Sequence, residues 1–127
     1  MIREFLDATA SGDLERLAKS LAGNVALVRD GDNLGAMAPD PIHGAAGVSD
    51  FLIQKIQAHL SLGTNIRKSR FRDVPLLLAY RGAKLVNAFA LVLRAGRIQT
   101  VYLVNCPVRL RSIAAQTQES NGEGSPL

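Results

Sequence analysis

The chain has 127 residues, a single domain's length that is sufficient to bury a hydrophobic core. Hydrophobic residues make up 47% of it and charged residues 20%, which excludes a largely disordered protein. The net charge of +4 permits an acidic partner without requiring one, and the aromatic content of 5% disfavours a stacking platform for single-stranded nucleic acid.

The sequence also limits where the protein works and what it binds. The longest apolar runs are shorter than the roughly 18–20 residues of a membrane span, and the first residues are too charged for a signal peptide, so we expect a cytoplasmic protein that does not bind a membrane. A single cysteine, Cys106, excludes an intrachain disulfide and a cysteine-cluster metal site. Two histidines, His43 and His59, are few for a zinc centre. We therefore expect no metal and no cofactor.

The N-terminal segment predicts two short helices. Residues 2–10 repeat apolar side chains at helical spacing, and Gly12 suits a left-handed stop. Asp13 is a good N-cap for the second helix, which we predict to end at Gly23-Asn24.

A strand pair and a third helix are predicted next. Residues 25–28 have the composition of a short strand, and Asp30-Gly31 begins a turn. A weak return strand is predicted at residues 36–38, before a break at Pro39-Asp40-Pro41. The apolar stripe that follows predicts a helix over about Ala45 to Leu60.

The rest of the folded chain predicts an antiparallel meander, which makes the arrangement α+β. From Ala114 onward the sequence is polar, so we predict a folded domain over residues 1–113 and a disordered tail over residues 114–127. The strands are predicted near Ile66–Asp73, Leu76–Tyr80, Lys84–Arg94 and Arg97–Cys106, with turns at Asp73-Val74-Pro75, Arg81-Gly82 and Ala95-Gly96.

The last two predicted strands carry apolar residues on both faces. A sheet with one solvated face would alternate apolar and polar residues, so each face is expected to be covered. The sequence therefore predicts a protein partner on the outer face of the sheet, either a second copy of the chain or another protein.

The residues resemble a known family, the SnoaL-like domain, a cystatin-like cone also seen in nuclear transport factor two and ketosteroid isomerase. The resemblance implies three N-terminal helices packed on a curved, mostly antiparallel sheet. Within that superfamily the chain most resembles the C-terminal domain of bacterial extracytoplasmic-function sigma factors, over about residues 2–113. The similar residues are Phe5-Leu6, Ser11-Gly12-Asp13-Leu14-Glu15, Leu21-Ala22, Val25, Asp30-Gly31, Pro41-Ile42-His43-Gly44 and Phe51-Leu52.

Two short motifs connect the chain to those sigma factors. Asp30 and Gly31 begin the loop that reads Asp-Gly-Gly-Gly-Lys in the family, and Pro107, Arg109 and Leu110 match its Asn-Pro-Asp-Lys-Leu run. The resemblance implies that these residues form a family-motif contact. It implies a non-catalytic regulatory or ligand-sensing domain that modulates transcription initiation by contacting a sigma region or RNA polymerase.

The chain would then be either an excised or truncated sigma-factor domain or a free-standing relative. It begins at the first helix of the SnoaL-like domain and shows no recognition helix, so we expect no sequence-specific DNA binding. A third interpretation is a free-standing homodimer that binds a small apolar ligand.

An enzyme of the isomerase, cyclase or hydrolase type is the main alternative, because related enzymes use an acid or base in a pocket. The candidates are Asp30, Asp32, Asp40 and Asp73, and His43 before the third helix. All four aspartates lie in predicted turns, where local hydrogen bonding alone favours Asp. We therefore predict surface or structural roles for all five residues and assign none of them to catalysis.

Asn87 is the most unusual polar residue because it lies mid-strand between apolar neighbours. If it faces the cone interior, it can hydrogen-bond a ligand; the alternatives are exposure or pairing with a neighbouring strand. Tyr80, Thr100 and Tyr102 would add hydroxyl groups to the same ligand pocket, and Phe89 would add an apolar wall.

Three other features receive ordinary structural interpretations. Cys106 is predicted to be a small core residue, and His59 to interact with the C-terminal dipole of the third helix. The basic run of Arg67, Lys68, Arg70 and Arg72 is predicted to be a solvated strand face; if functional, it would suit an acidic protein surface.

Overall fold

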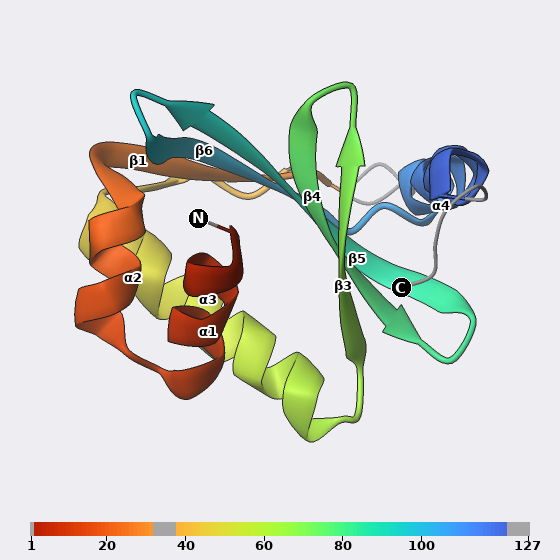
Figure 1. Ribbon diagram of the computed structural model, residues 1–127, viewed down its shortest axis with the longest axis horizontal. Helices are drawn as coiled ribbons and strands as arrows, with labels where there is room; N and C mark the ends of the chain where they lie inside the picture. The colour runs from red at the N-terminus through yellow and green to blue at the C-terminus, as the bar shows by residue number, and fades with distance from the viewer. Residues whose placement is uncertain (1, 32–37, 122–127) are drawn as a thin grey trace.

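The computed structural model describes residues 2–31 and 38–121 and consists of one curved sheet with helices on both sides (Figure 1). Asp32 and most of the weak strand predicted at residues 36–38 lie outside the described residues. In chain order the elements are α1 (Ile2–Ser11), α2 (Leu14–Ser20), β1 (Leu21–Arg29), β2 (Ile42–His43), α3 (Ala45–Ser61), β3 (Asn65–Phe71), β4 (Val74–Arg81), β5 (Lys84–Arg94), β6 (Arg97–Val104) and α4 (Pro107–Asn121).

The two N-terminal helices form as predicted, but the second is shorter than expected. Asp13 caps α2, its Oδ1 accepting a hydrogen bond from the backbone N–H of Arg16 at 3.2 Å. The helix ends at Ser20 rather than at Gly23-Asn24, because the chain enters β1 at Leu21. The pairing of β1 with β6 is irregular between Leu21 and Ala26, so Gly23-Asn24 lies in an irregular part of the strand.

The sheet has the strand order β2-β1-β6-β5-β4-β3. β1 runs parallel to β6, and the other neighbouring pairs are antiparallel. The β3–β4 turn is Arg72-Asp73, with φ angles of 51° and 71°, instead of the predicted Asp73-Val74-Pro75. Val74 and Pro75 join β4 because they pair with Phe71 and Arg70 of β3.

The inner face of the sheet is the one that α1, α2 and α3 cover (Figure 1). Its strand residues form one buried core with the helices, in which Leu77, Phe89 and Leu91 meet Phe5 and Leu52. The predicted α+β cone, with helices packed on a curved, mostly antiparallel sheet, is confirmed.

The outer face carries a helix that the sequence analysis did not predict. Helix α4 lies beside the β3–β5 part of the sheet, on the side away from α1–α3 (Figure 1), and Leu110, Ile113 and Ala114 pack against this face. The helix crosses the predicted boundary between domain and tail at Ile113. Since few of its residues are apolar, its sequence has the composition of a tail, and it is ordered by the sheet on which it packs.

A register shift in β5 places Leu85 and Asn87, two residues apart, on opposite faces of the sheet. Ala79 pairs with Asn87, whereas Tyr80 pairs with Leu85, so Val86 is an extra residue in β5. Such a bulge re-aims the side chains that flank it. Leu85 consequently packs in the outer core, and Asn87 points to the inner face. None of the helices in the described ranges is both long and apolar enough to cross a lipid bilayer.

Candidate functional site

Asn87 lies on the inner face and is 5% exposed. Its Nδ2 donates to the carbonyl oxygen of Val104 at 3.2 Å and to Oδ1 of Asn105 at 2.5 Å. Its Oδ1 lies 2.8 Å from Nε2 of His59. Because Nδ2 faces two acceptors, this network orients the amide and requires Nε2 of His59 to carry a hydrogen. The protein itself therefore satisfies both ends of the Asn87 amide, so the residue connects β5, β6 and α3.

His59 is the residue whose role sequence reasoning missed. It lies in the last turn of α3 and is buried, although it was expected only to interact with the helix dipole. Burial lowers the pKa of its imidazole; the hydrogen bond to Asn87 opposes this shift, and the nearby charges of Lys55 and Arg81 add to it. The ring is therefore neutral at pH 7, as its bond to Asn87 allows. The sequence signal for this pair was Asn87, a polar residue in an apolar strand. Its hydrogen-bond partner, His59, lies 28 residues earlier in the chain, so the pairing could not be inferred from local sequence.

The five residues predicted to line one ligand pocket lie on two faces of the sheet. Asn87 and Phe89 are on the inner face, where Phe89 is 1% exposed within the core. Tyr80 belongs to the outer core, with the guanidinium of Arg67 4.5 Å from its ring centroid. Thr100 and Tyr102 also face outward, since they share the side of β6 from which Val104 packs into the outer core. The structure does not bring these five side chains into one cavity.

Asp30, the first catalytic candidate, binds the start of α4. Its carboxylate accepts hydrogen bonds from the backbone N–H groups of Asn105 at 2.8 Å and Cys106 at 3.1 Å, and it pairs with Nη1 of Arg109 at 3.2 Å. A carboxylate at a helix N-terminus satisfies unpaired N–H groups and interacts favourably with the helix dipole. The geometry gives Asp30 the structural task of joining the end of β1 to α4.

The predicted family-motif residues lie close together in this chain. Asp30 pairs with Arg109, Pro107 begins α4, and Leu110 is buried in the outer core, while Gly31 directly follows Asp30 and is half-buried. The contacts that the structure shows among them are intramolecular. A contact of these residues with a partner protein stays a prediction.

The other polar candidates lie on the surface. Asp40, His43 and Asp73 are exposed, and the backbone carbonyl of Asp40 accepts a hydrogen bond from Arg29 at 2.8 Å. Cys106 is buried and reduced, as expected of a small core residue. The part of the chain that the structure describes has no group of three His, Cys, Asp or Glu side chains that would hold a metal ion.

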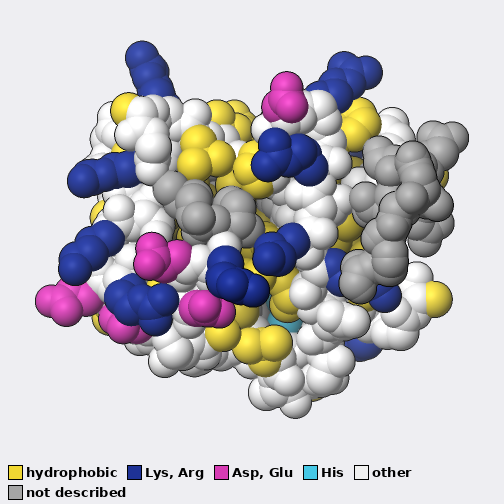
Figure 2. Space-filling view, viewed as in Figure 1, with side chains coloured by type: hydrophobic (Ala, Val, Ile, Leu, Met, Phe, Trp, Pro, Cys, Tyr) yellow, Lys and Arg dark blue, Asp and Glu magenta, His cyan; other side chains and the backbone are white. Residues whose placement is uncertain are grey.

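The basic run is spread along an exposed part of the sheet. Arg67, Lys68 and Arg70 of β3 are exposed, and Arg72 follows in the turn. Figure 2 shows Lys and Arg side chains distributed over the visible face rather than gathered in one patch. This distribution favours a solvated surface over a dedicated phosphate-binding stripe.

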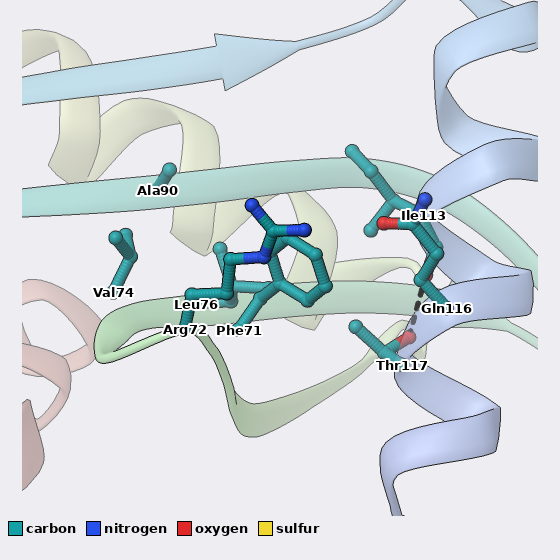
Figure 3. Close-up of a pocket in the computed structure, with 8 residues that line it drawn as sticks. All are labelled: Phe71, Arg72, Val74, Leu76, Ala90, Ile113, Gln116 and Thr117. Carbon is teal, nitrogen blue, oxygen red and sulfur yellow. Dashed lines mark hydrogen bonds between the residues drawn. The ribbon is translucent and has the colours of Figure 1, made fainter.

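The cavity that the sequence analysis missed lies between α4 and the outer face. Its volume is about 410 Å³, within the range of about 300–1,000 Å³ typical of small-molecule sites. The hydroxyl of Thr117 donates to the carbonyl of Ile113 at 2.8 Å, so it is already satisfied (Figure 3). The exposed surface of the cavity wall is almost wholly apolar. The lining residues are Phe71, Arg72, Val74, Leu76, Ala90, Ile113, Gln116 and Thr117.

A second cavity, of about 840 Å³, lies on the other flank of α4. A helix turns by about 100° per residue, so Ile113, Gln116 and Thr117 point to one side while Arg111 and Ala115 point to the other. Leu110, Ile113 and Ala114 form the row of helix residues that packs on the sheet, and they border the two cavities. The second cavity is lined by Arg81, Ala83, Lys84, Leu85, Val86, Asn105, Pro107, Leu110, Arg111, Ala114 and Ala115.

Comparison with known proteins identifies the fold. No protein-family model matches the chain, and no curated protein matches its sequence. A SnoaL-like protein of unknown function from Burkholderia thailandensis has 13% identity and a TM-score of 0.54, with 80% of this chain and 88% of that one covered. A protein of unknown function with a cystatin-like fold from Methylobium petroleophilum has 13% identity and a TM-score of 0.54, with 80% and 70% covered.

A de novo designed protein with a curved β-sheet is also similar, with 15% identity, a TM-score of 0.58, and 94% of this chain and 93% of that one covered. The chain therefore has the cystatin-like fold of the SnoaL-like proteins. Because a designed protein shares the architecture, the function has to be argued from the side chains of this chain.

Proposed function

We propose that this chain is a non-catalytic domain that binds a small apolar ligand in the cavity between α4 and the outer face of the sheet. The observation that carries the proposal is the apolar lining of that cavity, which includes Phe71, Val74, Leu76, Ala90 and Ile113. Apolar surface left in a hollow of this size is the default signature of a ligand site. A ligand there would bury the surface that α4 leaves uncovered.

Acid–base catalysis has less support from the same geometry. Asp30 is engaged by two backbone N–H groups and Arg109, and Asp40 and His43 lie on the surface. His59 is buried, but its Nε2 is engaged by Asn87. A general base needs hydrogen-bond reach to a substrate proton, and neither cavity beside α4 is lined by an acid or a histidine.

The resemblance to sigma-factor domains extends the proposal to regulation. In it, the domain modulates transcription initiation by contacting a sigma region or RNA polymerase, and the ligand controls that contact through α4. The support is that α4 forms one wall of the cavity and also carries Arg109, which pairs with Asp30 of the motif. A ligand that changes the packing of α4 would therefore change the position of the motif.

The proposed protein contact uses the part of the outer face beside α4. Val92 is 39% exposed and Tyr102 is 45% exposed; on the same face, Thr100 pairs with Val92 and lies two residues before Tyr102. Exposed apolar side chains that gather on a sheet face suit a protein interface. The partner is either a second copy of this chain or the sigma-type protein.

Ligand binding is tested by titrating the protein with N-phenyl-1-naphthylamine, a neutral apolar fluorophore. We expect saturable binding with enhanced fluorescence. Ala90→Phe fills the cavity and should weaken binding at least about tenfold, which corresponds to ~1.4 kcal/mol. Leu62→Phe is the control, since it adds a ring at an exposed apolar residue that follows α3 and lies outside the cavity. No saturable binding, or equal binding by Ala90→Phe, would contradict the proposal.

The proposed interface is tested by sedimentation velocity of the wild type and Tyr102→Glu. A wild-type dimer that the substitution dissociates would identify a second copy as the partner. If the wild type is a monomer at every concentration, the second-copy version is wrong, and binding to a purified sigma factor becomes the measurement. Tyr102→Phe is the control, because it keeps the apolar ring and removes only the hydroxyl.

A further inference from the structure

The two cavities beside α4 share one electrostatic property. Arg72 lines the first cavity, and Arg81, Lys84 and Arg111 line the second. None of the residues that line either cavity is Asp or Glu. No acidic side chain in the cavity walls compensates the positive charge of these residues, and this charge favours an anion beside α4.

Arg72 is held at the first cavity in a way that leaves its hydrogen-bonding edge free. Its guanidinium carbon lies 5.1 Å from the centroid of the Phe71 ring, stacked over the wall of the cavity (Figure 3). Gln116 lies across the cavity on α4 (Figure 3). Among the residues whose side chains the structure describes, Arg72 has no ion-pair partner. A stacked guanidinium still offers paired N–H donors that match a carboxylate.

The backbone at Arg72 adopts an uncommon conformation. Arg72 and Asp73 both have left-handed backbone angles, which Asn-Gly would adopt with little strain. A residue other than Gly, Asn or Asp in this region costs about 1–2 kcal/mol, so the cost falls on Arg72. Strain of this kind clusters at functional sites. Arg72 lies at the cavity in spite of that cost.

We propose that the ligand of the first cavity is an amphiphilic anion of the fatty-acid type, with its apolar chain against Leu76, Ala90 and Ile113 and its carboxylate on Arg72. This inference rests on the proposed function and names the chemical class of its ligand. The apolar wall accounts for the chain of the ligand, and the free guanidinium accounts for its charge. Gln116 can donate a second hydrogen bond to the carboxylate from α4.

The test compares decanoate with decanol, which has the same chain and no charge, by displacement of N-phenyl-1-naphthylamine. In 50 mM salt, we expect decanoate to bind about three- to tenfold more tightly than decanol, the range of a charge-assisted hydrogen bond at a partly exposed site. Raising the salt to 500 mM should weaken decanoate and leave decanol unweakened, because salt screens the ion pair. Arg72→Gln should abolish the preference.

Arg94→Gln is the matched control, since Arg94 is also exposed beside a β-turn but lies away from both cavities. It should keep the preference for decanoate.

Equal binding of decanoate and decanol by the wild type, or an unchanged preference in Arg72→Gln, would overturn the inference and leave the apolar-ligand proposal standing. Binding of the fluorophore without displacement by decanoate would overturn it too. If the fluorophore itself fails to bind, both proposals are wrong. Should Arg72→Gln fail to fold, the wild-type comparison at the two salt concentrations decides.

Discussion

The inner face of the sheet is fully covered by helices, whereas the outer face is covered only in part. On the inner face, α1–α3 and the strands close a continuous core, in which Leu77 and Leu91 are 0% exposed. The buried polar side chains of His59 and Asn87 on this face are hydrogen-bonded to each other. On the outer face, a single helix touches the sheet along a narrow row and leaves a cavity on each flank.

This difference indicates where function belongs in the molecule. A core that is filled and satisfied stabilises the fold and has little room for a ligand. Apolar side chains on a partly covered face lack van der Waals contacts on one side, and a ligand can supply those contacts. In this chain the sheet therefore acts as a scaffold on its inner side and as a binding surface on its outer side.

The largest expected effect compares two neighbouring leucines. Leu77 points into the inner core, and Leu76 lines the outer cavity on the same strand. Leu77→Ala should lower the free energy of unfolding by about 4 kcal/mol, and Leu76→Ala by about 2 kcal/mol, because Leu76 already borders empty space. Urea denaturation measures both values. Equal losses would mean that the outer face is packed as tightly as the inner one.

A smaller effect is expected at the connection between β1 and α4. Asp30→Ala removes the acceptor for the N–H groups of Asn105 and Cys106 and should cost about 1–2 kcal/mol, as for a lost helix cap. Hydrogen exchange should become faster in α4 and stay slow in β5. Asp40→Ala is the control, because only the backbone carbonyl of Asp40 is engaged. Unchanged exchange in α4 would show that packing alone holds the helix.

The smallest effect is a pH dependence that arises on the inner face. The pKa of His59 is lowered by burial in the folded state, so the unfolded chain binds more protons below pH ~6.5. Stability should therefore be fully present above pH ~6.5 and should fall as the pH drops through the lower folded value. Urea denaturation between pH 7.5 and 5 measures this change. The slope should diminish in His59→Gln and persist in His43→Gln; an equal slope in both variants would assign it to other groups.

The sequence was most informative where local signals define a boundary. The predicted limits of β5, Lys84 and Arg94, agree with the structure because turn residues flank a continuous apolar run. The third helix was predicted within one residue at its end, from its apolar stripe and the Gly63 that follows it. Asn87 was recognised as unusual because a polar residue in an apolar strand is visible in the sequence alone.

The site was less predictable because it depends on register and on distant contacts. An alternating pattern separates the two faces of one strand, but it does not tell which face of the next strand matches it. The bulge at Val86 reverses the pattern within β5, so Asn87 and Tyr80 could not be assigned to opposite faces. Helix α4 was missed because only its row of Leu110, Ile113 and Ala114 packs on the sheet.

The parallel pairing of β1 with β6 has a consequence for how the protein is made. Leu27 pairs with Val101, and Asp30 bonds to Arg109, which is 79 residues further along the chain. Contacts between residues so distant in sequence slow folding, because a long loop has to close before they form. A ribosome-bound chain that ends before β6 leaves β1 with only the short strand β2 as a neighbour. The domain is therefore expected to complete its folding only after β6 and α4 have been synthesised. Strand β1, although it is the first strand in the chain, would be among the last to form all of its contacts.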